Sequence, residues 1–67
     1  MQLLLNGEPV DLSGATIAEI LIERGLDPGR SGIAVAINGE VIPRASWNIH
    51  PLNDGDDIEV ITAMQGG

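Results

Sequence analysis

The sequence contains no cysteine, no lysine, no phenylalanine and no tyrosine. Without cysteine the chain can form no disulfide, offers no thiolate ligand to a metal and has no thiol nucleophile. Without lysine it has no ε-amine from which a Schiff base could form. These two absences exclude the chemistry of thiol enzymes and of Schiff-base enzymes.

Basic residues are also few. Ten Asp and Glu residues stand against three arginines, and the formal net charge is −7. Because a negative surface repels phosphate backbones and anionic lipids, we expect neither nucleic acid nor a membrane as partner. We interpret the acidity as a solvated surface, with steering toward basic partner proteins as the alternative.

Length and composition predict one small domain over residues 1–67. Hydrophobic residues make up 43% of the chain, but Trp47 is the sole aromatic residue, so the core must consist of Leu, Ile, Val and Ala. The opening apolar run ends at Asn6-Gly7, so it is too short for a signal sequence or a membrane span. It also has no basic flank. We therefore expect a cytoplasmic protein that is monomeric when free.

Two Asn-Gly pairs predict two β-hairpins, because Asn and Gly adopt the positive φ angles of tight turns. Asn6-Gly7 separates the runs 1–5 and 8–12, and Asn38-Gly39 separates the runs 33–37 and 40–42. A last strand, 58–62, follows a segment dense in turn-forming residues.

One helix is predicted between the two hairpins. Thr16 and Glu19 have the spacing of a capping box, and apolar residues recur at helical spacing over 17–21. Gly25 is a C-terminal cap, so the predicted helix spans 17–24. The resulting element order favours an α+β fold: a mixed sheet of four to five strands with one main helix packed across one face.

Three candidate sites are interpreted as structural. His50 is the single histidine and has no cysteine or hydroxyl partner with which to form a catalytic pair. The acidic residues of 54–59 lack the ligand spacing of a calcium loop and read as a turn, so we expect no metal site. The segment 29–32 lacks the spacing and the lysine of a nucleotide-binding loop. Any ATP must therefore be handled by a partner.

The last four residues are the candidate for chemistry. The last strand ends near Ala63, and Met64, Gln65, Gly66 and Gly67 follow it with a reach of at most about 14 Å. Glycines pass through a narrow channel and leave the terminal carbonyl open to a nucleophile. We expect 64–67 to be a flexible tail, although a terminal Gly-Gly also occurs in frayed ends and expression scars.

Several segments together resemble a known family. The strand order, the Asp54-Gly55-Asp56 turn and the terminal Gly66-Gly67 resemble the ubiquitin-like β-grasp superfamily. Within it, the Ile37-Asn38-Gly39 hairpin and the segment Ile42-Pro43-Arg44 followed by Trp47 resemble the sulfur carrier proteins of thiamine biosynthesis, the ThiS family. The similarity runs over the whole chain.

This resemblance implies a carrier protein and not an enzyme. A separate ubiquitin-activating-like enzyme would use ATP and magnesium to adenylate the Gly67 carboxylate. A persulfide donor such as a cysteine desulfurase would then convert it to a thiocarboxylate, and thiazole synthase would take the sulfur. Met64, Gln65 and Gly66 would thread through the partner's channel, and the chain itself would bind no cofactor.

Three alternatives stay open at this point. The small subunit of molybdopterin synthase shares the fold, the Gly-Gly end and the thiocarboxylate. A ubiquitin-like modifier would instead join its terminus to lysines of target proteins. A passive β-grasp interaction domain would not need Gly67.

The last strand also predicts a docking patch. If Ile58 and Val60 face the helix, then Ile61 and Ala63 lie on the opposite face of the sheet, together with Leu4. The first and last strands of a β-grasp sheet are adjacent, so we expect Leu4 and Ile61 to be neighbours. Leu4, Ile61 and Ala63 are thus predicted to form a partner-docking patch, the alternative being a second, minor core covered by the loop around Trp47.

Overall fold

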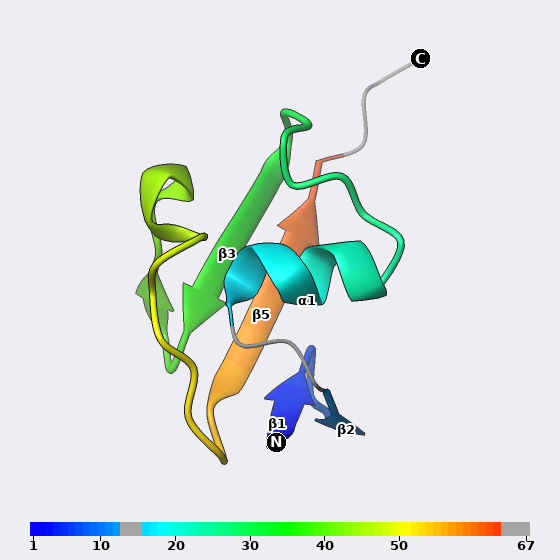
Figure 1. Cartoon of the computed structure of the whole chain (residues 1–67), viewed down its shortest axis with the longest axis vertical. Coiled ribbons are helices and arrows are strands. Elements are labelled where there is room, and N and C mark those ends of the chain that lie inside the picture. The colour runs from blue at the N-terminus through cyan, green and yellow to red at the C-terminus, as the bar shows by residue number, and fades with distance from the viewer. Residues whose placement is uncertain (13–15, 64–67) are drawn as a thin grey trace.

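The structure is a computed structural model that describes residues 1–12 and 16–63. Within these residues a five-stranded sheet carries one α-helix across one face (Figure 1). The elements in chain order are β1 (Gln2–Leu5), β2 (Glu8–Asp11), α1 (Ile17–Glu23), β3 (Ile33–Ile37), β4 (Glu40–Val41), the 3-10 helix η1 (Arg44–Ser46) and β5 (Asp57–Thr62). The predicted α+β architecture is confirmed.

The sheet is mixed, and the last strand lies in its middle. The strand order is β2-β1-β5-β3-β4. β5 runs parallel to β1 on one side and antiparallel to β3 on the other, and the two hairpin pairings are antiparallel. The expected adjacency of the first and last strands is therefore confirmed.

The alternation of apolar residues decides which face of the sheet meets the helix. Leu3 and Leu5 of β1 are buried, whereas Leu4 between them is 38% exposed. On α1, positions 17, 18, 20 and 21 are buried, which is the helical spacing predicted. Each fully buried aliphatic side chain stabilises the fold by about 1.5–3 kcal/mol. The core consists of Leu3, Leu5, Leu12, Ile17, Ala18, Ile20, Leu21, Val35, Ile37, Ile42, Trp47, Leu52 and Ile58.

The helix begins and ends as the sequence predicts, within one residue. The Thr16 hydroxyl oxygen accepts a hydrogen bond from the Glu19 N–H at 3.3 Å and donates to the Glu19 carboxylate at 3.1 Å. Gly25 has φ +81°, and the Leu26 N–H donates to the Leu21 carbonyl at 2.8 Å. Such a bond around a left-handed residue closes a helix.

Both Asn-Gly turns form, and their asparagine side chains also bind the central strand. Asn6 and Asn38 have φ of 51° and 52°. The Asn6 Oδ1 accepts a hydrogen bond from the Val60 N–H at 2.8 Å, and the Asn38 Oδ1 accepts one from the Asp57 N–H at 3.0 Å. The two hairpins thus hold β5 from opposite sides.

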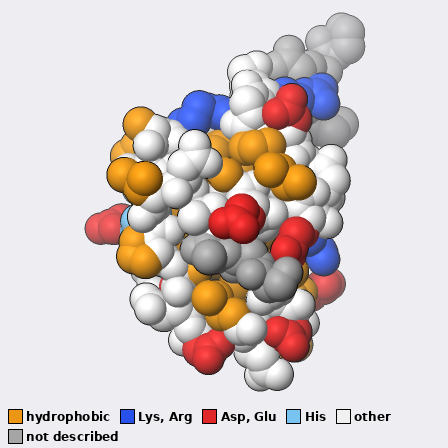
Figure 2. All heavy atoms as spheres, viewed as in Figure 1, with side chains coloured by type: hydrophobic (Ala, Val, Ile, Leu, Met, Phe, Trp, Pro, Cys, Tyr) orange, Lys and Arg blue, Asp and Glu red, His pale blue; other side chains and the backbone are white. Residues whose placement is uncertain are grey.

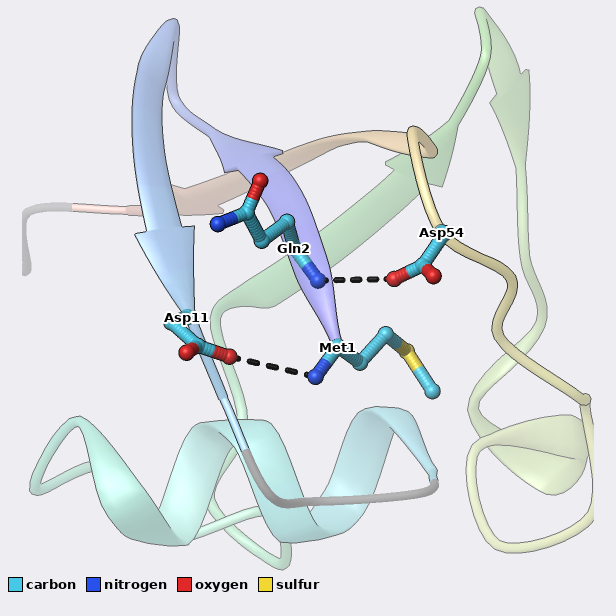
Figure 3. Close-up of polar contacts among 4 residues, drawn as sticks. All are labelled: Met1, Gln2, Asp11 and Asp54. Atoms are coloured by element: carbon cyan, nitrogen blue, oxygen red, sulfur yellow. Dashed lines mark hydrogen bonds and ion pairs between the residues drawn. The ribbon is translucent and has the colours of Figure 1, made fainter.

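The acidic segment before β5 is a turn, as predicted, and it holds the start of β1 (Figure 3). The Asp54 carboxylate accepts a hydrogen bond from the Gln2 N–H at 2.8 Å, and the Gly55 N–H donates to the Gln2 carbonyl at 2.8 Å. The terminal amine of Met1 lies 3.1 Å from the Asp11 carboxylate of β2. The Asp54 side chain therefore binds the backbone of β1.

We expect Asn38→Gly to lower the free energy of unfolding by about 1–2 kcal/mol, since it removes two side-chain hydrogen bonds of about 1 kcal/mol each. These are the bond to the Asp57 N–H and the bond from Asn38 Nδ2 to the Asp56 carboxylate, 3.1 Å long. Glycine tolerates the positive φ, so the turn itself stays unstrained. Urea unfolding measures the change. Asn48→Gly, at an exposed turn position, is the control for added backbone entropy. An equal loss in both variants would mean that the Asn38 amide contributes nothing.

Candidate functional site at the root of the C-terminal tail

The predicted reactive end follows directly after the central strand. Gly67 and the threading residues Met64, Gln65 and Gly66 lie outside the described residues. β5 ends at Thr62, and Ala63 is the last residue that the structure describes. The site can therefore be built up to its root, which is the end of β5.

The root is tied to the loop between α1 and β3. The Ala63 N–H donates to the Gly32 carbonyl at 2.7 Å. This loop is in turn folded around Asp27, whose carboxylate accepts a hydrogen bond from the Gly29 N–H at 2.9 Å and whose carbonyl accepts one from the Arg30 N–H at 3.0 Å. The position of the root thus depends on how the loop 27–32 is held.

Arg44 holds that loop. Its guanidinium donates to the carbonyl of Pro28 and, at 2.6 Å, to the carbonyl of Arg30, and it stacks 4.4 Å above the ring of Trp47. Trp47 is buried, and its Nε1–H donates to the Ile42 carbonyl at 3.0 Å. Trp47 therefore belongs to the core, which the composition alone assigns to Leu, Ile, Val and Ala. The contacts of Arg44 were not predicted, because no local pattern indicates which backbone carbonyls a surface arginine reaches.

The face of the sheet opposite the helix carries an exposed apolar patch beside the root. Ile61 is 61% exposed and pairs with Ala34, while Val41 is 72% exposed and pairs with Ala36. With Ala63 these residues form what we call the open-face patch (Ala34, Ala36, Val41, Ile61 and Ala63). The exposure of Ile61 and Val41 contradicts the alternative of a second core beneath a loop of the described chain.

Leu4 lies on the same face but is not a neighbour of Ile61, and this expectation was wrong. The parallel register pairs Leu4 with Asp57, four residues before Ile61. At about 3.3 Å per residue, this offset separates the two side chains by about 13 Å along the sheet. Glu59 shares their face and lies between them along β5. The apolar surface next to the root therefore comes from β3, β4 and β5, and Leu4 lies apart from it.

The other candidates retain structural roles. The His50 Nδ1–H donates to the adjacent Pro51 carbonyl at 2.9 Å. Within residues 1–12 and 16–63, no group of three or more His, Asp and Glu side chains is placed to hold a metal ion. Over the same residues, no helix has the length and apolarity needed to cross a membrane.

The charges are unevenly distributed over the helix-bearing face. Figure 2 shows the basic side chains toward the upper and right margins of this face, while acidic side chains are scattered across it. Two of the three arginines, Arg24 and Arg30, line hollows beside the end of β5. Two basic side chains thus lie beside the root of the tail in a chain whose net charge is −7.

Known proteins resemble this chain in sequence and in fold. A profile of the ThiS family matches residues 3–67. The sulfur carrier protein ThiS of Thermus thermophilus is 44% identical over 63 residues, covering 94% of this chain and 95% of that protein. A thiazole synthase of Paramagnetospirillum magneticum is 35% identical over 68 residues, and the match covers this whole chain but 20% of that protein.

A solved structure agrees with these matches. The crystal structure of a thiamine biosynthesis protein (ThiS) from Geobacter metallireducens superposes with a TM-score of 0.79 at 31% identity, over the full length of both chains. This likeness confirms the ubiquitin-like fold that the sequence predicts. With the profile match over nearly every residue, it shows that the chain belongs to the ThiS family.

Proposed function

We propose that this chain is a sulfur carrier protein of thiamine biosynthesis and that it carries the sulfur on the carboxyl group of Gly67. The observation that carries the proposal is the extent of the family match. It runs from residue 3 to residue 67 and so includes the Gly66-Gly67 end together with the folded body. Members of this family carry sulfur and do not catalyse its transfer, so the chain is a co-substrate of other enzymes.

The chemistry explains why partners are needed. A carboxylate is a poor electrophile, so we propose that an adenylating enzyme uses ATP and magnesium to join Gly67 to AMP, with release of pyrophosphate. The acyl adenylate has a good leaving group, and the outer sulfur of a protein persulfide displaces the AMP to form an acyl disulfide with the donor cysteine. We propose that a second thiol, supplied by a partner enzyme, then attacks the donor cysteine's sulfur. This step breaks the S–S bond, forms a new disulfide with the donor cysteine and leaves the transferred sulfur on Gly67. The product is a thiocarboxylate on Gly67, a sulfur nucleophile in a chain that has no cysteine of its own.

Thiazole synthase is the acceptor that the comparisons support. A protein with that name contains a segment similar to this entire chain. Two activities joined in one polypeptide usually act on a common intermediate, so we propose that thiazole synthase accepts the sulfur from Gly67. The persulfide donor and the adenylating enzyme complete the proposed set of partners.

The geometry at the root supports delivery of the tail. The Ala63–Gly32 hydrogen bond and the Arg44 contacts hold the end of β5, which the last four residues follow in the sequence. A partner that grips the domain beside this point can reach Gly67 within about 14 Å. The open-face patch lies there, and exposed apolar patches of this kind mark binding surfaces. We propose it as the docking surface for the adenylating enzyme, with Leu4 as a separate contact on the same face.

Deleting Gly67 is expected to abolish ATP–pyrophosphate exchange by the adenylating enzyme, because the carboxyl group then sits on the wrong residue. Gly67→Val is expected to do the same by blocking a narrow channel. Circular dichroism and the melting temperature should stay at wild-type values, since position 67 lies beyond the end of β5. Exchange that persists in the truncated chain would rule out Gly67 as the activated residue.

Ile61→Glu is expected to weaken binding to the adenylating enzyme by about tenfold or more, because it places a charge in an apolar contact. Ile22→Glu is the matched control, since Ile22 is 62% exposed on the helix and Ile61 is 61% exposed on the open face. Calorimetric titration and thermal melting of both variants, with Leu4→Glu alongside, make the test. If Ile61→Glu and Ile22→Glu bind equally well, the open-face patch is not the docking surface.

A further inference from the structure

The central strand has one edge that is only partly paired. In an antiparallel pair, alternate residues of a strand point their N–H and C=O groups at the partner strand. The Asn38 N–H donates to the Asp57 carbonyl at 2.8 Å, and the Ala63 N–H donates to the Gly32 carbonyl. Together with the register of β3 and β5, these bonds show that the backbone N–H and C=O groups of residues 57, 59, 61 and 63 point toward β3.

The backbone N–H and C=O groups of the even-numbered residues of β5 therefore point toward the β1 side. The Asn6 N–H donates to the Ile58 carbonyl at 2.8 Å, and the Asn6 side chain accepts the bond from the Val60 N–H. The β1–β5 pairing ends at Leu5 and Ile58, and β5 continues past the β1–β2 hairpin (Figure 1). Among the described residues, no strand pairs with the carbonyl of Val60 or with the N–H and carbonyl of Thr62 on this side.

Two hollows lie along this open edge. One, of about 400 Å³, is lined by the hairpin, the end of α1 and β5, and the other, of about 510 Å³, is lined by the loop before β3. They share Leu26 and Thr62, so they adjoin, and we call the two together the groove. The partly buried side chains of Leu26 and Val60 supply apolar surface in it.

The rim of the groove carries basic charge that is scarce elsewhere on the chain. Arg24 lines one hollow and Arg30 the other, and each hollow also has one acidic residue, Glu8 or Asp27. The groove thus holds two of three arginines but two of ten acidic residues. The two arginines balance the two acidic residues, so the groove is neutral in a chain of net charge −7, and a carboxylate side chain meets less repulsion there than on an acidic surface.

We propose that the open edge of β5 binds an extended segment of thiazole synthase, which adds a short strand beside Val60 and Thr62. Its aliphatic side chains would cover Leu26 and Val60, which are only partly buried, and a carboxylate would meet Arg24 or Arg30. Strand addition to an exposed edge is a common mode of peptide recognition. The added strand lies beside the root of the tail and so directs it into the enzyme. This inference rests on the proposed function, which supplies the partner.

Thr62→Pro tests the inference, because it removes the outward N–H and no bond to β3. Its affinity for purified thiazole synthase is expected to fall by about tenfold or more, while its melting temperature stays near that of the wild type. Thr62→Val keeps the N–H and is expected to bind normally. Arg24→Gln is expected to weaken binding, and Arg24→Lys to retain it. If the wild type and Thr62→Pro bind thiazole synthase equally well, strand addition at this edge is wrong. The proposed sulfur-carrier function would not be affected by that result.

Hydrogen exchange of the wild-type chain provides a second readout that does not depend on a folded variant. In the free protein the Thr62 amide is expected to exchange faster than that of Ile61, which faces β3, and to become protected when thiazole synthase is added. A Thr62 amide that stays unprotected in the complex would contradict strand addition, even if Thr62→Pro proved unstable. A wild-type chain that does not bind the enzyme at all would instead refute the proposed partner.

Discussion

The placement of β5 in the middle of the sheet is the constraint on which the rest of the structure depends. It pairs with β1 on one side and β3 on the other, and the side chains of Asn6 and Asn38 reach across from the two hairpins to its backbone amides. Ile58 anchors it in the core. The proposed reactive end therefore follows in sequence a strand that is paired on both sides over its first part and with β3 alone at its end.

That arrangement separates the folded body from the chemistry. In the described residues the lone histidine bonds to a neighbouring carbonyl, and the acidic turn serves the backbone. What the body offers is two surfaces that border the root of the tail, the open-face patch and the groove along the edge of β5. Arg44 bonds to the loop that receives the hydrogen bond from Ala63. The proposed function requires binding to an adenylating enzyme and to thiazole synthase, and two distinct surfaces beside Ala63 are suited to two partners.

Much of this could be predicted from the sequence, for local physical reasons. The burial of Leu3 and Leu5 around an exposed Leu4 follows from strand alternation, and the helix start follows from the Thr16–Glu19 spacing. The register between β1 and β5 could not be predicted, because alternation fixes the face of a side chain but not the offset between strands far apart in sequence. For that reason the prediction that Leu4 lies beside Ile61 is wrong, and Leu4 pairs with Asp57. The carbonyl contacts of Arg44 and the open edge at Thr62 likewise depend on where distant segments meet.

The central claim is that Gly67 carries sulfur, and the intact mass of the chain purified from its own cells tests it most directly. The account predicts a population whose mass has gained the difference between sulfur and oxygen, with fragmentation placing that gain on Gly67. The gain should vanish in cells that lack the adenylating enzyme. A terminus that is always an ordinary carboxylate, or one found joined to lysines of other proteins, would contradict the account.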